Sequence, residues 1–482
     1  MNQPVKNIAF TFVLLLSALG AGAQDIWSLE RCVQYAQDNN ISVKQAEANV
    51  KLSLLSERQA KASRYPNLSA SFNAGEQFGR TIDPTSNQFS TQATGYNSLG
   101  FNAGASIFQG GLIHHSIKQA GWDIKASEAD AEQLYNDLAL QIAAAYLNIL
   151  LTEEQATNAR NRLELSGRQL VNTLKLIDAG TLPQADRFNV DAQIAREEQV
   201  VVVAQNSVDL AYLSLKQLLQ LEPDFELVIE HPQVLIPADA NPGSKSLTPL
   251  YAVATGNQPN VRAAGFRIKS AEEGVHIARS AYLPSVSVFA NLSSNYSTQF
   301  QEFKFTGNTV QGATQIVSVN GMDIPIAFYE PEYTVKRVPY FDQIDRNFGQ
   351  GLGLNISIPI YQNGRTRLSV ERAKLGILNA QLQDNQTRQR LKNDIQTAIA
   401  NARSAQKQLD AAQKTVDATR IAFSNMEKRH ALGAINTLNL STAKNNLDIA
   451  ETDLIVAKYD YLFKLKILDF YEGKKIQLDG GN

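Results

Sequence analysis

The amino-acid sequence contains one arrangement twice. The segment from Ser28 to Pro66 recurs from Ser246 to Pro284, at an offset of 218, and the segment from Leu99 to Asp186 recurs from Leu352 to Asn439, at an offset of 253. Because the offsets differ by 253 − 218 = 35, the second copy carries about 35 additional residues between Pro284 and Leu352. Such a duplication predicts two equivalent structural repeats.

The first 23 residues have the pattern of a secretory signal peptide. Lys6 precedes an apolar run from Ile8 to Leu19, and small residues permit cleavage after Ala23. No later stretch is apolar over the ~18 residues that a membrane helix needs, so no helical span is predicted in the mature chain. Cys32 is the only cysteine and cannot form an intrachain disulfide. A net charge of −2 excludes the basic field that nucleic-acid binding requires.

Each copy begins with a segment whose composition predicts helix. Residues 28–63 are rich in Ala, Gln, Glu, Lys and Leu, and they contain neither proline nor glycine. Residues 246–282 form the second such segment, which Pro259 interrupts. We therefore expect each segment to be two short helices, with breaks near Asn39-Asn40 and Asn257-Gln258.

Four segments alternate apolar with small polar residues, a pattern that predicts β-strands. They lie at about residues 67–76, 97–108, 285–295 and 348–361. The polar positions hold Gly, Ser and Asn with almost no charge, and each segment has about the ten residues that a tilted membrane strand requires. Strands in a bilayer must close into a barrel, and four are too few, since about eight is the minimum. A membrane location therefore requires oligomerisation. A soluble sheet with one solvated face is the alternative.

Each copy continues into a long helical hairpin, at residues 111–221 and 364–471. The first arms have equal length, 180 − 111 = 69 and 433 − 364 = 69, between glycines. Gly180 and Gly433 mark the predicted turns, because glycine can leave a helix with a positive φ angle at no steric cost.

The repeats divide the chain into a signal peptide at 1–23, a first structural repeat at 24–245 and a second at 246–482. Polar segments at 222–245 and 472–482 follow the two hairpins at equivalent places. Each is predicted to pack as a small collar outside the helices. A plain linker and a plain tail are the alternative.

The additional residues of the second copy are predicted to fall wholly in an extracellular insert at about 297–346. Asn320-Gly321 lies between two β-prone runs, 315–319 and 322–324, which predicts a β-hairpin. The insert is rich in aromatic residues and lies between the third and fourth strands, so we expect it at the exterior. It forms either a lid over a barrel mouth or a variable surface loop.

The order of these elements resembles the TolC-like outer-membrane efflux family, also called outer membrane factors. The residues that carry the resemblance include Leu29–Ala36 with Asn39-Asn40, Ala62–Leu68, Ile107–Gly111, Leu283-Pro284, Ile358–Gly364 and the two glycine turns. It implies a mostly α fold with membrane β, internally duplicated. Long helical hairpins would form a periplasmic barrel in a homotrimer, and four strands per chain would enter a shared twelve-stranded transmembrane β-barrel.

The resemblance implies a passive exit duct in the cell outer membrane, extending into the periplasm. Its partners would be outer-membrane lipid, a periplasmic adaptor (membrane fusion protein) and an inner-membrane pump of a tripartite efflux or type I secretion system. A soluble periplasmic coiled-coil adaptor or scaffold is the alternative function. The sequence contains no phosphate-binding glycine loop, metal-binding helix motif or nucleophile elbow, so we predict no catalytic residue, cofactor or metal.

The resemblance also implies a gate at the hairpin tips. The family places an acidic residue six positions after each tip glycine, where this chain has Asp186 and Asn439. Asn439 and Thr442 match positions that often carry acidic rings, and both are neutral here, which argues against a cation-selective gate. The resemblance pairs Asp186 with His430, a contact that would latch the mouth and respond to pH near neutrality. Two unrelated solvated residues are the alternative.

Adaptors of the family dock at the hairpin turns. The resemblance therefore gives the contact residues as Gly180, Thr181, Leu182, Gly433, Ala434 and Ile435. Ile435 replaces a basic residue of the family, so one of its latches is missing. Structurally, the same residues serve as helix caps.

Overall fold

The helices of the two repeats have the same lengths. The structure, a computed structural model, describes residues 26–82, 87–91, 93–232, 242–319, 321–432 and 434–474. In the first repeat the helices are α2 (Leu29–Asn39), α3 (Ile41–Ala62), α4 (Leu112–Asp178) and α5 (Ala185–Leu219). In the second the corresponding helices are α6 (Leu247–Asn257), α7 (Pro259–Ser280), α9 (Arg365–Ala431) and α10 (Thr437–Tyr471). Each pair matches, at 11, 22, 67 and 35 residues. The internal duplication of the fold is confirmed.

The entry segments break where the sequence indicates. Asn40 and Gln258 have extended backbone between the paired short helices. The Asn40 side chain stabilises the restart, because its Oδ1 accepts the Ser42 N–H at 2.8 Å and its Nδ2 donates to the Leu218 carbonyl at 2.9 Å. The predicted signal peptide and residues 475–482 of the second collar lie outside the described residues.

Four strands form one antiparallel sheet in the order β10-β7-β5-β2. They are β2 (Asn67–Gln77), β5 (Thr94–Gln109), β7 (Ser285–Ser297) and β10 (Gly349–Ser357). The two repeats meet at the β5–β7 pair, where Ala103 faces Ala290. The fourth strand ends before its predicted end at residue 361, because Pro359 has no N–H to donate to a ladder. The four predicted strands are confirmed.

The register of the sheet places apolar residues of all four strands on one face. Leu68 faces Ala103, Ala103 faces Ala290, and Ala290 faces Leu352. Leu68 and Leu352 are 82% and 85% exposed in the single chain. The opposite face carries mainly Ser, Asn and Gly and no charged residue, and the one charged residue of the four strands, Glu76, lies near the end of β2 on the apolar face. A sheet this apolar on its exposed face requires a non-aqueous neighbour.

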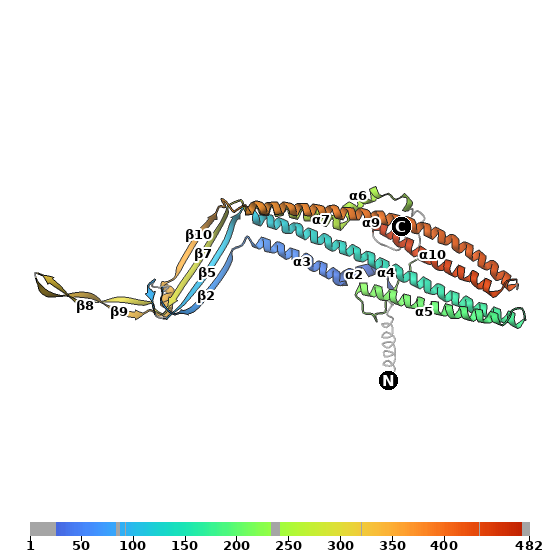
Figure 1. Ribbon diagram of the computed structural model, residues 1–482, viewed down its shortest axis with the longest axis horizontal. Helices are drawn as coiled ribbons and strands as arrows, with labels where there is room; N and C mark the ends of the chain where they lie inside the picture. The colour runs from blue at the N-terminus through green and yellow to red at the C-terminus, as the bar shows by residue number, and fades with distance from the viewer. Residues whose placement is uncertain are drawn as a thin grey trace, which may run out of the picture. The chain divides into compact units, whose positions relative to one another are not determined.

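Contacts divide the chain into two compact units. One contains the described residues up to Leu55, from Gly121 to Ser270 and from Gly376 onward; the other contains residues 56–120 and 271–375. In the first unit, α4 runs antiparallel to α5, and α9 runs antiparallel to α10 (Figure 1). In the second unit, the four-stranded sheet is accompanied by α8 (Tyr340–Arg346) and by a separate hairpin, β8 (Gln301–Val319) with β9 (Met322–Arg337).

The main hydrophobic core of the first unit gathers α2, α4, α5 and α10. Ile142, Ile149, Leu215 and Leu219 are fully buried there. Tyr146 connects this core to the segment after α5, since its hydroxyl lies 2.6 Å from the Glu230 carbonyl and 3.1 Å from the Trp27 carbonyl. Trp27 belongs to β1 (Ile26–Trp27), which forms a short parallel pair with β6 (Val228–Ile229), and Glu230 directly follows β6. Part of the first predicted collar therefore packs against the helices.

Among the described helices, α4 alone has the length and composition of a possible membrane span. A window of α4 is long and apolar enough to cross a membrane by length and composition. Leu138, Ile142 and Leu150 of α4 belong to the hydrophobic core, which accounts for this composition. The sequence-based expectation missed the window because its apolar residues are not consecutive.

Cys32 provides a test of the core. Its side chain is fully buried, and burial raises the pKa of the thiol to about 12. Since the thiolate is the reactive form, we expect no maleimide or disulfide-reagent labelling of the native protein near pH 8 and complete labelling after unfolding in denaturant. Mass spectrometry of the labelled chain measures this. Rapid labelling of the native protein would contradict the packing of α2.

Candidate functional site

The first hairpin turns tightly at Gly180. Gly180 has φ +74°, and an added Cβ would meet no atom within 4 Å, so the glycine is required by backbone conformation and not by space. The Thr181 N–H donates to the Leu176 carbonyl at 2.9 Å, and its hydroxyl donates to the same oxygen at 2.7 Å. These bonds close the end of α4 and leave Gly180 and Thr181 exposed, with Leu182 half-buried.

The second hairpin turn is closed by a helix cap. Asn436 caps α10, since its side-chain oxygen accepts the Asn439 N–H at 3.0 Å. The Ala434 N–H donates to the Arg429 carbonyl at 2.9 Å. Ala434 is exposed and Ile435 is half-buried, whereas Gly433 lies outside the described residues.

The two predicted latch residues are both buried near the tips. Asp186 is 9% exposed in the first turn of α5, and His430 is 7% exposed in the last turn of α9. The Asp186 charge acts on the pKa of His430. The polar neighbour of the His430 ring is Thr437, whose hydroxyl lies 3.3 Å from Nε2. The structure thus brings the two together without an ion pair between them among the described contacts, and the latch stays a prediction.

The other two gate candidates are exposed. The Asn439 backbone is bound by the α10 cap, and the Thr442 hydroxyl donates to the Leu438 carbonyl at 2.9 Å. The sequence reasoning missed exposed apolar residues beside the turns. Phe188, Leu432 and Leu438 are 68%, 83% and 66% exposed. Their position next to a helix turn was the available signal, because a solvated tip has no need of large apolar side chains.

The sequence reasoning also missed a buried group of four charges, which we call the ionic cluster: Arg162, Glu197, Lys444 and Asp448. Lys444 Nζ lies 3.2 Å from Glu197 Oε1 and 3.1 Å from Asp448 Oδ2. Arg162 Nε lies 3.2 Å from Asp448 Oδ2 and 3.6 Å from Glu197 Oε2. The cluster connects α4 and α5 of the first hairpin to α10 of the second. Its members are separated by up to 448 − 162 = 286 residues, so no local pattern could indicate the cluster.

The ionic cluster is neutral overall and almost completely shielded from water. The side chains of Lys444 and Glu197 are 1% and 2% exposed. Burial raises the pKa of Asp448, while Lys444 and Arg162 oppose that rise. Removing one member of such a buried group leaves an uncompensated charge, which is strongly unfavourable. The cluster therefore holds α10 against the first hairpin in one defined arrangement.

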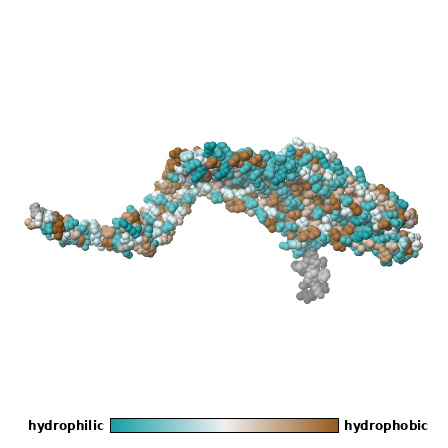
Figure 2. Space-filling view, in the orientation of Figure 1, coloured by the Kyte–Doolittle hydropathy of each residue, from teal (hydrophilic) through white to brown (hydrophobic). Residues whose placement is uncertain are grey.

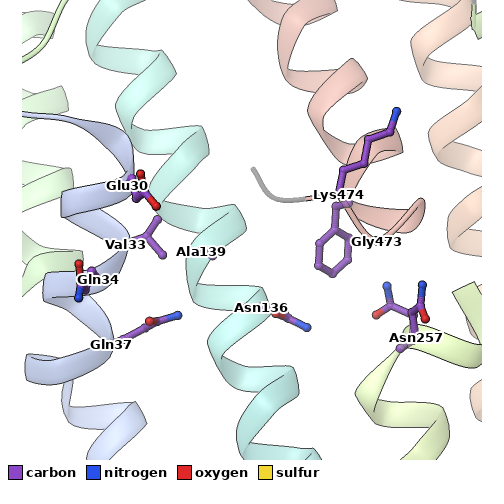
Figure 3. A pocket seen from close by; sticks show the side chains of 11 residues that line it. Glu30, Val33, Gln34, Gln37, Asn136, Ala139, Asn257, Gly473 and Lys474 are labelled. Atoms are coloured by element: carbon purple, nitrogen blue, oxygen red, sulfur yellow. The ribbon is translucent and has the colours of Figure 1, made fainter. Parts of the chain in front are cut away.

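A cavity of about 710 Å³ lies between α2, α4 and the ends of α6 and α10 (Figure 3). Amide side chains dominate its lining: Gln34, Gln37, Asn136, Asn257 and Gln258. Glu30 and Lys474 are its charged residues, and its lining includes no Ser, Cys or His. The cavity can hold water or a polar solute.

The described residues contain no group of three His, Cys, Asp or Glu side chains placed to hold a metal ion. His115 and His276 stack with ring centroids 4.6 Å apart, and His115 Nδ1 lies 2.6 Å from Glu273 Oε2. These contacts join α4 of the first repeat to α7 of the second. Packing between the two repeats therefore accounts for the histidine pair.

Comparison with known proteins supports a channel. Residues 32–220 and 333–473 match the family described as outer membrane efflux protein. The chain belongs to this family. The match includes most of the first repeat and the C-terminal part of the second, from residue 333 to residue 473.

Individual relatives agree with the family assignment. Outer membrane efflux protein BepC of Brucella suis biovar 1 (strain 1330) is 20% identical over 428 residues, covering 88% of this chain and 80% of BepC. Outer membrane protein TolC of Escherichia coli (strain K12) is 22% identical over 395 residues, covering 80% and 72%. The solved structure of CusC superposes with a TM-score of 0.72 at 16% identity, covering 93% of this chain and 92% of CusC.

Family membership assigns the molecule to the outer membrane with an extension into the periplasm. It is an efflux-type exit duct, and its family consists of channel proteins. The apolar face of the four-stranded sheet fits this location, because lipid supplies the non-aqueous neighbour that the face requires. The match favours the channel over the soluble adaptor.

Proposed function

We propose that three copies of this outer membrane efflux protein form one continuous duct and that its periplasmic tips dock onto an adaptor. The observation that carries the proposal is the pair of free sheet edges. Among the described strands, β2 and β10 each have one neighbour only. Unpaired N–H and C=O groups cannot remain in hydrocarbon, so each edge requires a partner strand from another copy.

Closure by three copies is consistent with the sheet. Three four-stranded sheets give 3 × 4 = 12 strands, above the roughly eight that a barrel needs. Pairing β10 of one copy with β2 of the next would continue the antiparallel order β10-β7-β5-β2 around the ring. The Gly, Ser and Asn face would then line the interior, and the apolar face would contact outer-membrane lipid.

At the periplasmic end, the docking surface would comprise the two turns and their apolar neighbours. Gly180, Thr181 and Ala434 are exposed, and Phe188 and Leu432 add apolar area beside them. Apolar anchors surrounded by polar residues are typical of protein interfaces. Since the duct carries no nucleotide-binding motif, energy would come from an inner-membrane pump, and substrate choice would rest mainly with that pump.

The test is a planar-bilayer recording combined with native mass spectrometry of the purified protein. We expect a mass of three chains and a low resting conductance that rises in Asp186→Ala, because that variant removes the buried acid beside His430. A monomer without channel activity would overturn the proposal. A trimer whose conductance is unchanged in Asp186→Ala would remove the latch and leave the duct intact.

The tips should loosen as the pH falls. Burial lowers the pKa of His430, and the Asp186 charge opposes this only in part. The unfolded tip therefore binds a proton at a higher pH than the folded tip does. The stability that neutral His430 contributes to the tip is present above a pH of about 6.5 and is lost as the pH falls below it. Between pH of about 7.5 and about 5.5, amide hydrogen exchange at residues 425–440 should accelerate after correction for intrinsic rates. His430→Gln should reduce this acceleration, and an equal response in both proteins would contradict the assignment.

A further inference from the structure

The β8–β9 hairpin is unusually long for an isolated pair of strands. Its ladder runs from Gln301 opposite Arg337 to Val319 opposite Met322, and β8 and β9 pair only with each other among the described strands. Gly321, with φ +81°, closes the turn at the predicted Asn-Gly site. An isolated two-stranded hairpin is at best marginally stable in water. The structure extends the predicted hairpin well beyond the runs at 315–324.

One face of the outer half of the hairpin is apolar. Met322, Ile324, Ile326 and Phe328 alternate along β9 and therefore share a face, to which Val317 adds from β8 opposite Ile324. All five are exposed. Figure 2 shows hydrophobic residues gathered near the end of this hairpin. The opposite face is mixed: Ser318 and Asp323 pair there with each other, and Ile316 and Tyr329 share that face.

The base of the hairpin is held firmly by α8. Gln343 is 1% exposed; its Oε1 accepts the Ser297 N–H at 3.0 Å, and its Nε2 donates to the Val338 carbonyl at 2.9 Å. Asn347 Nδ2 donates to the Asn295 carbonyl at 2.8 Å. A base fixed by buried hydrogen bonds presents the strands from a defined place at the end of the sheet.

That place adjoins the proposed contact between copies. The hairpin leaves the sheet between β7 and the edge strand β10, at the end of the sheet where β2 also finishes. If β10 pairs with β2 of the next copy, each hairpin begins beside a neighbouring copy, and three hairpin bases surround the threefold axis. The contact between hairpins would continue the contact between sheets.

We propose that the β8–β9 hairpins of the three copies pack on one another around the threefold axis through the face formed by Val317, Met322, Ile324, Ile326 and Phe328. The occupant of this apolar face is thus a second copy of the same chain. This inference rests on the proposed trimer and adds an extracellular assembly contact to it. Each copy supplies the same face at the same height, which is the condition for a closed symmetric contact.

Two other occupants fit less well. Burial in lipid would leave the outer backbone edges of β8 and β9 without hydrogen-bond partners. It would also place the charged Asp323 side chain in hydrocarbon, which is unfavourable. A foreign protein could cover the face, but it would have to be present whenever the duct is assembled. The neighbouring copies satisfy this condition through the assembly itself.

Cysteine cross-linking tests the proposal in the full-length purified protein. Ile324→Cys lies on the apolar face, and Ile316→Cys, on the opposite face and 70% exposed, is the matched control. The wild type is the blank, because Cys32 is buried. After treatment with a short bismaleimide, we expect most Ile324→Cys chains to shift to the mass of a covalent dimer in a denaturing gel and Ile316→Cys chains to remain monomeric. Native mass spectrometry of the untreated samples records the oligomeric state independently.

The outcomes separate the two proposals. A trimer in which Ile324→Cys stays monomeric, or cross-links no better than Ile316→Cys, overturns the hairpin contact and leaves the duct standing. Absence of a trimer overturns the proposed function and the hairpin contact together. Cross-linking of Ile324→Cys in native membranes to a protein of different mass, or quenching of a fluorophore at this position by brominated lipid, overturns the assignment to a second copy.

Discussion

Lys444→Met should sharply destabilise the half of the helical hairpins that carries the tips. The substitution leaves Glu197 and Asp448 buried with Arg162 as their single positive neighbour. Breaking a buried charge group in this way costs about 3–5 kcal/mol. We expect amide hydrogen exchange along α10 near residue 444 to accelerate by a corresponding factor and the resting conductance in planar bilayers to rise, because α10 loses its defined position against the first hairpin.

Two further variants identify the cause of this loss. Arg168→Met on α4 removes an exposed ion pair with Glu164, at 67% and 71% exposure, and should cost only about 0–1 kcal/mol. Combining Lys444→Met with Glu197→Gln restores a neutral group of Arg162 and Asp448, so part of the lost protection should return. An effect of Lys444→Met no larger than that of Arg168→Met would show that the ionic cluster does not hold α10.

Gly110→Ala should impair assembly at the junction between β5 and α4. Gly110 has φ +62°, and an added Cβ would lie 2.5 Å from the Ser280 carbonyl oxygen and 2.8 Å from the Leu283 Cβ. The left-handed backbone alone costs an alanine about 1–2 kcal/mol, and overpacking adds about 1–3 kcal/mol. We expect a lower yield of folded oligomer and a lower temperature at which it dissociates in detergent, measured by heat-dependent gel migration.

Gly121→Ala is the matched control for this prediction. Gly121 lies inside α4, and an added Cβ would meet no atom within 4 Å. Alanine favours helix over glycine by about 1 kcal/mol, so this variant should be neutral or more stable. Equal yields and dissociation temperatures for Gly110→Ala and Gly121→Ala would contradict the close contact between the β5–α4 junction and the end of α7.

The sequence predicted most of the secondary structure because the signals are local and occur twice. Proline and asparagine mark the breaks between short helices, and alternation over about ten residues marks each strand. The insert was predicted only around its Asn-Gly turn. Its long β8–β9 ladder contains register shifts near residues 305–309 and 311–314, which interrupt the alternation that a pattern search requires.

The candidate site was less accessible to sequence reasoning. The residue type of Gly180 predicts a turn. The family resemblance predicts that Asp186 and His430 form a latch. The hydrogen-bond geometry of His430, which places it near Thr437, depends on how two helix ends meet. The ionic cluster has no sequence signature, because Lys and Glu at helix positions are usually solvated and only packing between three helices buries them.

The duplicated sequence by itself determined the element order, the matched helix lengths and the two-faced strands, since each depends on residues close together in the chain. Only the tertiary structure decided that β5 pairs with β7, that β2 and β10 remain as edges, and that Glu197 meets Lys444 across 444 − 197 = 247 residues. Such long-range pairings depend on which surfaces the packed elements can bury together, and local patterns do not encode that choice.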